Sequence, residues 1–212
     1  MKQYYARRAD EYEAIYHKPE RQSNLRLLES RIAEVFAGRK VLEIACGTGY
    51  WTQFASRSAL SITATDINPE VIAVAATKEY HVAPNFQIAD AYAPQDIAGK
   101  FDALLSAFWW SHVPKQRLAE FLGNLHKRLP SGSLMVFLDN RYVEGSSTPI
   151  AHTDEFGNTF QDRALKDGTT HRVLKNFPNS EEIKIALARF ADDIEITELE
   201  YYWLATCRST GK

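Results

Sequence analysis

A short apolar run that breaks into a two-glycine turn constrains this chain more than any other feature. Residues 41–45 read as a buried strand, and the turn at Gly47 and Gly49 runs on into a predicted helix. Glycine lets backbone N–H groups approach a ligand closely, because no Cβ stands in the way. The first turn of the helix adds N–H donors without partners. This strand–turn–helix arrangement is typical of folds that bind a nucleoside cofactor.

The same turn argues against a dinucleotide site. The glycine fingerprint of such sites needs glycine or alanine at position 52, where this chain has Thr52. Glu43, just before the turn, is also unusual for a dinucleotide site. The turn therefore disfavours a nicotinamide-dependent oxidoreductase.

Two acids follow at the ends of the next predicted strands. Asp66 ends the β-rich run 61–66 and lies 17 residues after Gly49. This is close to the spacing of about 20 residues at which a carboxylate meets a ribose in nucleotide folds. Asp90 ends the third run, 85–89. The acids and the glycine turn occur in the order that a nucleoside site requires.

Glu43-x-x-x-Gly47-x-Gly49, followed by Asp66 and Asp90, resembles the first motifs of class I S-adenosylmethionine-dependent methyltransferases, over roughly residues 40–138. The resemblance implies S-adenosylmethionine (SAM) as cofactor and S-adenosylhomocysteine (SAH) as product. It places Asp66 on the ribose and Asp90 on the adenine amino group. Further cofactor contacts that it implies are Tyr12, Glu43, Ala45, Cys46, Gly47, Thr48, Gly49, Trp51, Ile67, Asn68, Ala91, Ser106, Ala107 and Phe108.

The alternation of strand-like and helical segments predicts an α/β fold with a doubly wound, mostly parallel sheet. The final segments, 193–199 and 201–207, resemble the closing strand pair of this methyltransferase fold, in which the last strand is antiparallel. A helix at about 180–190 precedes them, and Asn179 and Glu182 have the spacing of a capping box. We expect seven strands, the other five at 40–45, 61–66, 85–89, 101–106 and 133–138.

We expect one domain with two additions to this core. The N-terminal segment carries Tyr5, Tyr12 and Tyr16 near one helix face, which either close over the cofactor as a lid or simply pack on the core. A hairpin at 157–165 and 169–175, turning at Lys166-Asp167-Gly168, is expected to overhang the pocket as a substrate cap. The segments are 1–36 (helical lid), 37–138 (cofactor-binding core), 139–178 (cap insertion) and 179–212 (final helix and strand pair).

The loop after the fourth strand is the expected place of methyl transfer. His112 is the leading candidate for a general base, with His152 and His171 as alternatives, and a structural role stays open. Trp109 and Trp110 either form aromatic walls for a flat acceptor or pack in the core. After the fifth strand, Arg141 and Tyr142 either bind an anionic group of the acceptor or form local contacts.

Charge and composition narrow the function further. A net charge of −2 and a pI near 6.3 disfavour a generally basic nucleic-acid surface. The two cysteines, Cys46 and Cys207, are too few for a disulfide framework and fit the reducing cytoplasm. We expect no metal site and no membrane span.

The leading hypothesis is methyl transfer to an O or N nucleophile of a small molecule, aromatic or heterocyclic in type. The protein is expected to be a monomer or a homodimer. The alternatives are a tRNA- or protein-directed methyltransferase and a non-catalytic SAM-binding protein.

Overall fold

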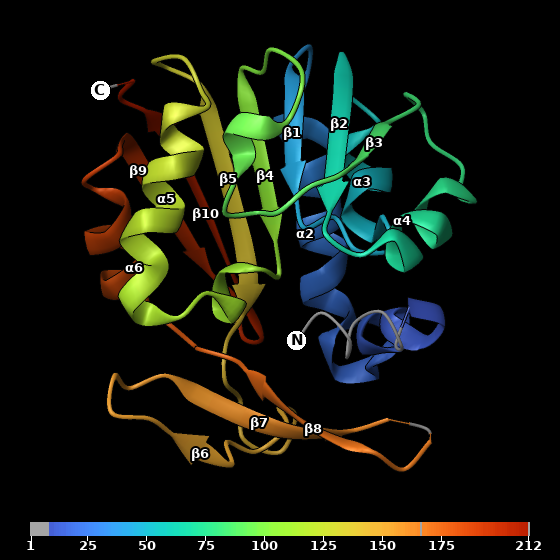
Figure 1. The fold of residues 1–212 in the computed structure, drawn as a ribbon, viewed down its shortest axis with the longest axis vertical. Helices are drawn as coiled ribbons and strands as arrows, with labels where there is room; N and C mark the ends of the chain where they lie inside the picture. The colour runs from blue at the N-terminus through green and yellow to red at the C-terminus, as the bar shows by residue number, and fades with distance from the viewer. Residues whose placement is uncertain (1–8, 166, 212) are drawn as a thin grey trace.

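A seven-stranded sheet in the order β3-β2-β1-β4-β5-β10-β9 forms the centre of the molecule (Figure 1). The structure is a computed structural model that describes residues 9–165 and 167–211, with side chains described from residue 13 onward. The strands are β1 (Lys40–Ile44), β2 (Ser61–Asp66), β3 (Asn85–Ile88), β4 (Ala103–Ala107), β5 (Leu134–Asn140), β9 (Ala191–Glu198) and β10 (Tyr202–Ser209).

The pairing of the strands confirms the predicted topology. Strands β1 to β5 pair in parallel, whereas β10 runs antiparallel to both β5 and β9. The neighbours β1 and β4 are not consecutive in sequence, and the strand order reverses between them. In open α/β sheets this switch point is where ligands bind, beyond the carboxyl ends of the strands.

Helices cover both faces of the sheet because the strands alternate their apolar side chains. Val41 faces the core shared with α2 and α3, while Leu42 and Ile44 face the core shared with α5 and α6. The α-helices are α2 (Gln22–Val35), α3 (Tyr50–Ala55), α4 (Pro69–Ala76), α5 (Leu118–Lys127) and α6 (Ser180–Leu187), and α6 begins with the predicted capping box. Short 3-10 turns are η1 (Ala9–His17), η2 (Pro19–Arg21), η3 (Pro94–Asp96), η4 (Trp110–His112) and η5 (Lys115–Arg117).

The insertion between β5 and α6 forms a separate three-stranded sheet, which we call the cap. It contains β6 (His152–Thr153), β7 (Thr159–Ala164) and β8 (Thr170–Leu174), in the order β6-β7-β8. The predicted hairpin corresponds to β7 and β8, whereas the short β6 was not predicted; Lys166 of the predicted turn lies outside the described residues. Figure 1 shows the cap lying beyond the end of the main sheet to which β5 points.

The N-terminal segment differs in detail from the expected helix. Its described part is the 3-10 turn η1, followed by η2 and then by α2. Tyr5 and the side chain of Tyr12 lie outside the described residues, so the expected tyrosine face is described only at Tyr16. Tyr16 is buried, its ring stacks on Tyr50 at 3.8 Å between centroids, and its hydroxyl accepts a 3.1 Å hydrogen bond from Trp51 Nε1.

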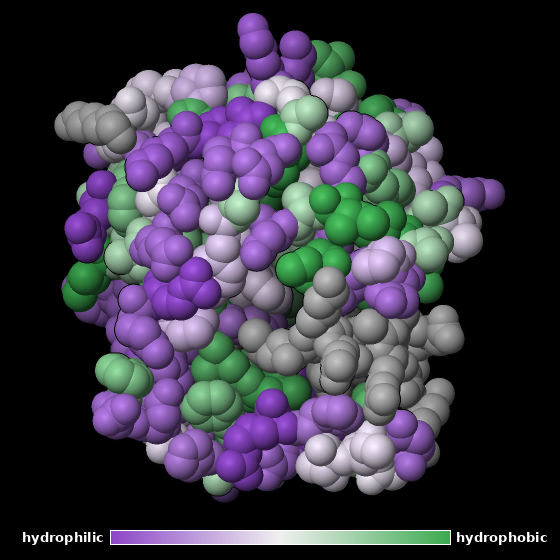
Figure 2. Space-filling model, in the orientation of Figure 1, coloured by the Kyte–Doolittle hydropathy of each residue, from purple (hydrophilic) through white to green (hydrophobic). Residues whose placement is uncertain are grey.

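No helix in the described residues is long and apolar enough to cross a membrane. Within the same residues, no group of three or more His, Cys, Asp and Glu side chains is arranged to hold a metal ion. On the face shown in Figure 2, hydrophilic side chains cover most of the surface and apolar ones gather near its middle.

Candidate active site

The turn after β1 adopts the left-handed backbone that its glycines permit. Gly47 has φ +55° and Gly49, which precedes α3, has φ +78°. Ala45 shares this conformation at φ 55°, where a side chain is strained. A Cβ on Gly49 would collide with the hydroxyl of Tyr80, whereas one on Gly47 would meet no described atom within 4 Å. Gly47 thus borders open space, and Gly49 packs against the helix α4 region.

Asp66 closes the turn from the neighbouring strand. Its Oδ2 accepts a 3.1 Å hydrogen bond from the backbone N–H of Gly47, and its Oδ1 accepts a 2.9 Å bond from the N–H of Asn68. Burial raises the pKa of the Asp66 carboxyl, while these N–H donors oppose the rise. The carboxylate is therefore fixed in position at the carboxyl end of β2.

A cavity of about 320 Å³ opens between this turn and the loop after β4. We call it the glycine-loop cavity. Most of the residues predicted along the cofactor line it. Its lining is Ala45, Gly47, Thr48, Asp66, Ile67, Asn68, Val71, Ala89, Asp90, Ala91, Tyr92, Ala107, Phe108, Trp109, His112 and Arg117.

The polar atoms of this cavity suit a nucleoside. Two of them, Asn68 Oδ1 and Trp109 Nε1, are buried and have no hydrogen-bond partner among the described residues. Such atoms are costly unless a ligand or water satisfies them. The carboxylates of Asp66 and Asp90, at the ends of β2 and β3, supply hydrogen-bond acceptors. The hydroxyl and amino groups of a nucleoside require such acceptors. The residues present therefore fit an adenosine-type group.

Several residues predicted to contact the cofactor lie behind this cavity instead of lining it. Cys46, Gly49 and Ser106 belong to the turn and to β4 but do not line the cavity. Trp51 packs in the core, with its ring stacked on Phe108 at 5.7 Å between centroids. Glu43 is fully buried, and this burial raises the pKa of its carboxyl to about 8.

Four residues that line the cavity were missed in the sequence: Val71, Ala89, Tyr92 and Arg117. The guanidinium of Arg117 lies 4.0 Å from the centre of the Tyr92 ring, so the two form one flat wall. Tyr92 closely follows Asp90 in sequence, so the motif that identified Asp90 could also have identified Tyr92. Arg117 directly precedes α5 and is distant from the Asp90 motif in sequence, and no motif pointed to it.

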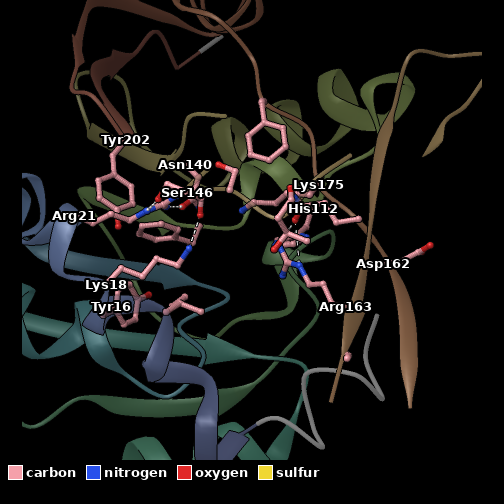
Figure 3. Close-up of a pocket in the computed structure, with 17 residues that line it drawn as sticks. Tyr16, Lys18, Arg21, His112, Asn140, Ser146, Asp162, Arg163, Lys175 and Tyr202 are labelled. Atoms are coloured by element: carbon pink, nitrogen blue, oxygen red, sulfur yellow. Dashed lines mark hydrogen bonds between the residues drawn. The ribbon is translucent and has the colours of Figure 1, made fainter. Parts of the chain in front are cut away.

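A second cavity of about 320 Å³ lies between the core, the N-terminal segment and the cap; we call it the cap cavity (Figure 3). Phe108 and His112 line both cavities. The cap cavity is lined by Ile15, Tyr16, Lys18, Arg21, Phe108, His112, Asn140, Ser146, Ser147, Thr148, Gln161, Asp162, Arg163, Ala164, Lys175, Phe177 and Tyr202.

His112 is held by the cap. Its Nδ1 lies 2.6 Å from the carbonyl oxygen of Leu174 on β8. A carbonyl only accepts, so Nδ1 carries the proton and the lone pair of the neutral ring is on Nε2. Burial lowers the pKa of His112 well below its usual value, and the charges of Lys175 and Arg163 lower it further, with Asp139 opposing. The imidazole is thus neutral at pH 7.

A buried ion pair joins the cap to the main sheet beneath the cap cavity. Lys175 Nζ donates to Asp139 Oδ1 at 2.9 Å and to Ser111 Oγ at 2.6 Å. Burial alone would raise the pKa of Asp139, but Lys175 holds it below the usual value; burial lowers the pKa of Lys175. The pair fixes β8 against β5 next to His112.

Three acceptor-site candidates adopt the core packing or the local contacts that the sequence left open for them. Trp110 is buried in the core, edge-on to Phe137 and Trp203, and lines neither cavity. Arg141 is captured by the strand pair β9–β10: it donates to Leu199 O at 2.6 Å and pairs with Glu198 at 3.3 Å. Tyr142 packs against Phe177 outside the cavity lining. The aromatic and cationic walls come from other residues.

His152 and His171 lie on the cap but do not line the cap cavity. The basic side chains that do line it are Lys18, Arg21, Arg163 and Lys175. No sequence pattern grouped these four residues, because they come from separate segments: Lys18 precedes η2, Arg21 ends η2, Arg163 lies in β7 and Lys175 follows β8.

Comparisons with known proteins agree with this geometry. A family model described as a methyltransferase domain matches residues 41–132. A search of curated proteins finds no significant match.

Among solved structures, this chain is similar to a DhpI–SAH complex, with 29% sequence identity and a TM-score of 0.76. The match covers 99% of this chain and 95% of the DhpI chain. A DhpI–SAM–HEP complex is 28% identical with coverages of 97% and 94% and a TM-score of 0.77. A SAM-dependent methyltransferase from Methanosarcina mazei, 17% identical over 82% of this chain and 94% of its own with a TM-score of 0.65, shares the fold.

The seven-stranded sheet with its reversed last strand, the left-handed glycine turn and the paired acids define a methyltransferase fold and its nucleoside site. The chain is a class I S-adenosylmethionine-dependent methyltransferase. The prediction of the class from the sequence is confirmed.

Proposed function

We propose that this methyltransferase acts on an O or N nucleophile of a small molecule held in the cap cavity. One observation carries the proposal: Phe108 and His112 line both cavities, so the two spaces meet at these side chains. SAM bound along the glycine loop would present its methyl group toward this junction. The acceptor would approach it from the cap side.

The volume and walls of the cap cavity support a small acceptor. Its volume of about 320 Å³ is at the lower end of the range for small-molecule sites. The rings of Tyr16, Phe108, Phe177 and Tyr202 line it, which suits an aromatic or heterocyclic acceptor. The similar protein DhpI forms a complex with SAM and HEP together, which supports a ternary arrangement here.

In the proposed reaction, SAM supplies an electrophilic sulfonium methyl, and the S–C bond breaks with its electron pair going to sulfur as the new bond to the acceptor forms. A protonated O–H or N–H nucleophile must also lose its proton. His112 is the proposed base, with Nε2 as the receiving atom, because Nδ1 donates to Leu174 O. Orientation by the two cavities supplies the rest, worth about 7–11 kcal/mol in favourable cases.

In the proposed cofactor complex, Asp66 would accept hydrogen bonds from the ribose hydroxyls and Asp90 would accept one from the adenine amino group. Both carboxylates line the glycine-loop cavity, and Asp66 is already aligned by Gly47 and Asn68. The side walls for the adenine would be Tyr92, Trp109 and Arg117.

The test is to incubate the protein with methyl-labelled SAM and a cell extract separated into small-molecule, RNA and protein fractions. Label in the small-molecule fraction is expected. Label in RNA or protein alone would instead establish the tRNA- or protein-directed alternative. SAH binding by calorimetry without transfer to any fraction would indicate a non-catalytic SAM-binding protein.

Two coarser expectations belong to the same proposal. Both cysteines are buried and free, which suits a reducing compartment such as the cytoplasm. Sedimentation of the purified protein would distinguish the two expected states, a monomer and a homodimer.

A further inference from the structure

We propose that the acceptor is a small organic acid, and that Lys18, Arg21 and Arg163 bind its oxyanion in the cap cavity. This proposal rests on the proposed function, because it names the substrate class of the same site. The three side chains come from separate parts of the chain, and Figure 3 shows Lys18 and Arg21 on one side of the cavity and Arg163 on the other.

The hydrogen-bond partners of these three cations are neutral. Arg21 donates from Nε to Ser146 Oγ at 2.9 Å and from Nη1 to Asn140 Oδ1 at 3.2 Å. Lys18 donates to the carbonyl oxygen of Ser146. Arg163 donates from Nε and Nη2 to the side-chain oxygen of Gln161, at 3.2 Å and 2.6 Å. Among the described residues, no carboxylate forms an ion pair with any of them.

Several other cations of the molecule form ion pairs with carboxylates. Arg117 pairs with Glu120, Arg172 pairs with Asp162, and Lys175, on the floor of the cap cavity, pairs with Asp139. The pair between Arg172 and Asp162 matters most here, because Asp162 is the carboxylate that lines the cap cavity. Because Arg172 engages Asp162, that carboxylate forms no ion pair with Lys18, Arg21 or Arg163. Glu20, an exposed acid outside the lining, offsets the charge of Lys18 and Arg21 only in part.

Burial makes the lack of an ion pair at Arg21 among the described residues informative. Arg21 is only 6% exposed, although a buried charge is costly unless it is paired. The rings of Tyr201 and Tyr202, at 5.1 Å and 5.7 Å from its guanidinium carbon, stabilise it in part. Glu20, the acid next to it in sequence, is exposed and accepts from Ser146 Oγ. An oxyanion in the cavity would supply the missing partner.

The shape of the donors also favours an oxyanion. Guanidinium groups match the oxygen pairs of carboxylates and phosphates, and a lysine adds a point charge. Arg21 also forms a hydrogen bond with the hydroxyl of Tyr202. The hydrogen bonds of Arg163 to Gln161 use Nε and Nη2, which leaves its Nη1 for a ligand. A carboxylate and a phosphate ester both meet this chemistry, so the binding experiment includes both.

The experiment measures binding to the SAH complex, so that no turnover is needed. The probes are benzoate, phenyl phosphate and inorganic phosphate, with benzamide as the neutral counterpart of benzoate. We expect saturable binding of at least one anion, weakened by added salt, and none of benzamide. Benzoate binding alone would identify a carboxylate site; phosphate binding with phenyl phosphate would identify a phosphate site.

The variants are Arg163→Gln and Lys18→Gln, with Arg189→Gln as the control that removes the same charge from an exposed position outside both cavities. We expect the Kd of the bound anion to rise roughly tenfold to a hundredfold in each test variant, the range for losing a hydrogen bond to a charged group. Arg189→Gln should bind as the unchanged protein does, and circular dichroism should show all three folded.

Two results would overturn the proposal. One is that none of the three anions binds; the other is that an anion binds equally well to Arg163→Gln and Lys18→Gln. The proposed function can stand when this proposal fails: if label from SAM appears in neutral small molecules and Arg163→Gln is as active as the unchanged protein, the acceptor is small but not an acid.

Discussion

The Nδ1 atom of His112 lies 2.6 Å from the carbonyl oxygen of Leu174, a residue of the cap. This contact crosses from the loop after β4 to the end of β8. It selects the tautomer in which Nε2 carries the lone pair. The cap therefore does more than wall the cap cavity, because it also sets the tautomer of the proposed base.

We expect His112→Asn to lower kcat by roughly 10²- to 10⁴-fold, the usual contribution of a general base. Asparagine can still donate to Leu174 O, so the cap should stay in place and the affinity for SAH should stay within a few-fold. Because the pKa of His112 is held well below its usual value, kcat of the unchanged protein should not fall near pH 6.5. Equal kcat for the two proteins from about pH 5 to about pH 9 would assign His112 a structural role.

Asp66→Ala should weaken SAH binding by about 1–3 kcal/mol, because hydrogen bonds to a charged group are lost. Isothermal calorimetry gives the value directly. Asp192→Ala is the control, since Asp192 is an exposed acid on β9. An unchanged affinity in Asp66→Ala would contradict the proposed ribose contact.

Gly49→Ala should destabilise the fold for two reasons, the left-handed backbone and the collision with Tyr80. Gly132→Ala measures the backbone effect alone. Gly132 has φ +77°, but a Cβ there would meet no described atom within 4 Å. Left-handed backbone alone costs about 1–2 kcal/mol. Urea denaturation should show Gly132→Ala losing about that amount and Gly49→Ala losing more; equal losses would mean that Tyr80 moves aside freely.

Glu43→Gln should stabilise the cofactor-free protein at alkaline pH. The folded state keeps the Glu43 carboxyl protonated up to a pKa of about 8, while the unfolded chain ionises near the ordinary value of 4.5. Stability is therefore fully present below about pH 4.5 and falls as pH rises toward 8, by at most about 1.4 kcal/mol per pH unit. The gap between Glu43→Gln and the unchanged protein should widen over this window in urea denaturation. A constant gap would show that Glu43 is ionised in the folded state.

Lys175→Met should destabilise the protein by about 3–5 kcal/mol, because it leaves the Asp139 carboxylate buried without its partner. The double variant Lys175→Met, Asp139→Asn removes both charges and should recover part of the loss. Denaturant titrations of the two variants measure the difference. Asp139 also accepts hydrogen bonds from the backbone N–H of Ser111 and from Asn140. A double variant less stable than Lys175→Met would mean that Asp139 stabilises the fold chiefly through these bonds.

The sequence predicted those parts of the site that a short stretch of chain builds by itself. Gly47 and Asp66 were found because a strand end, a turn and a spacing fix them locally. Tyr92 lay beside the Asp90 motif and was still overlooked. The seven strands were also predictable, since each carries its own apolar pattern.

The cap cavity was much less predictable. Arg21 and Arg163 meet there only because the cap docks across the ends of the main sheet, which no local pattern reveals. Arg141 was predicted at the cavity because it follows β5 directly, but the neighbouring Leu199 and Glu198 capture it. Long-range packing decided which cation faces the acceptor.

The cap leaves the main fold after β5 and rejoins it before α6, while the sheet keeps one uninterrupted strand order. The segment proposed to wall the acceptor and the turn proposed to hold the methyl donor therefore belong to separate stretches of the chain. A change confined to the cap would replace Arg163 and its surroundings and leave the turn at Gly47 and the carboxylate of Asp66 in the main fold. On the proposed function, one wall of the acceptor cavity can vary while the donor half stays the same.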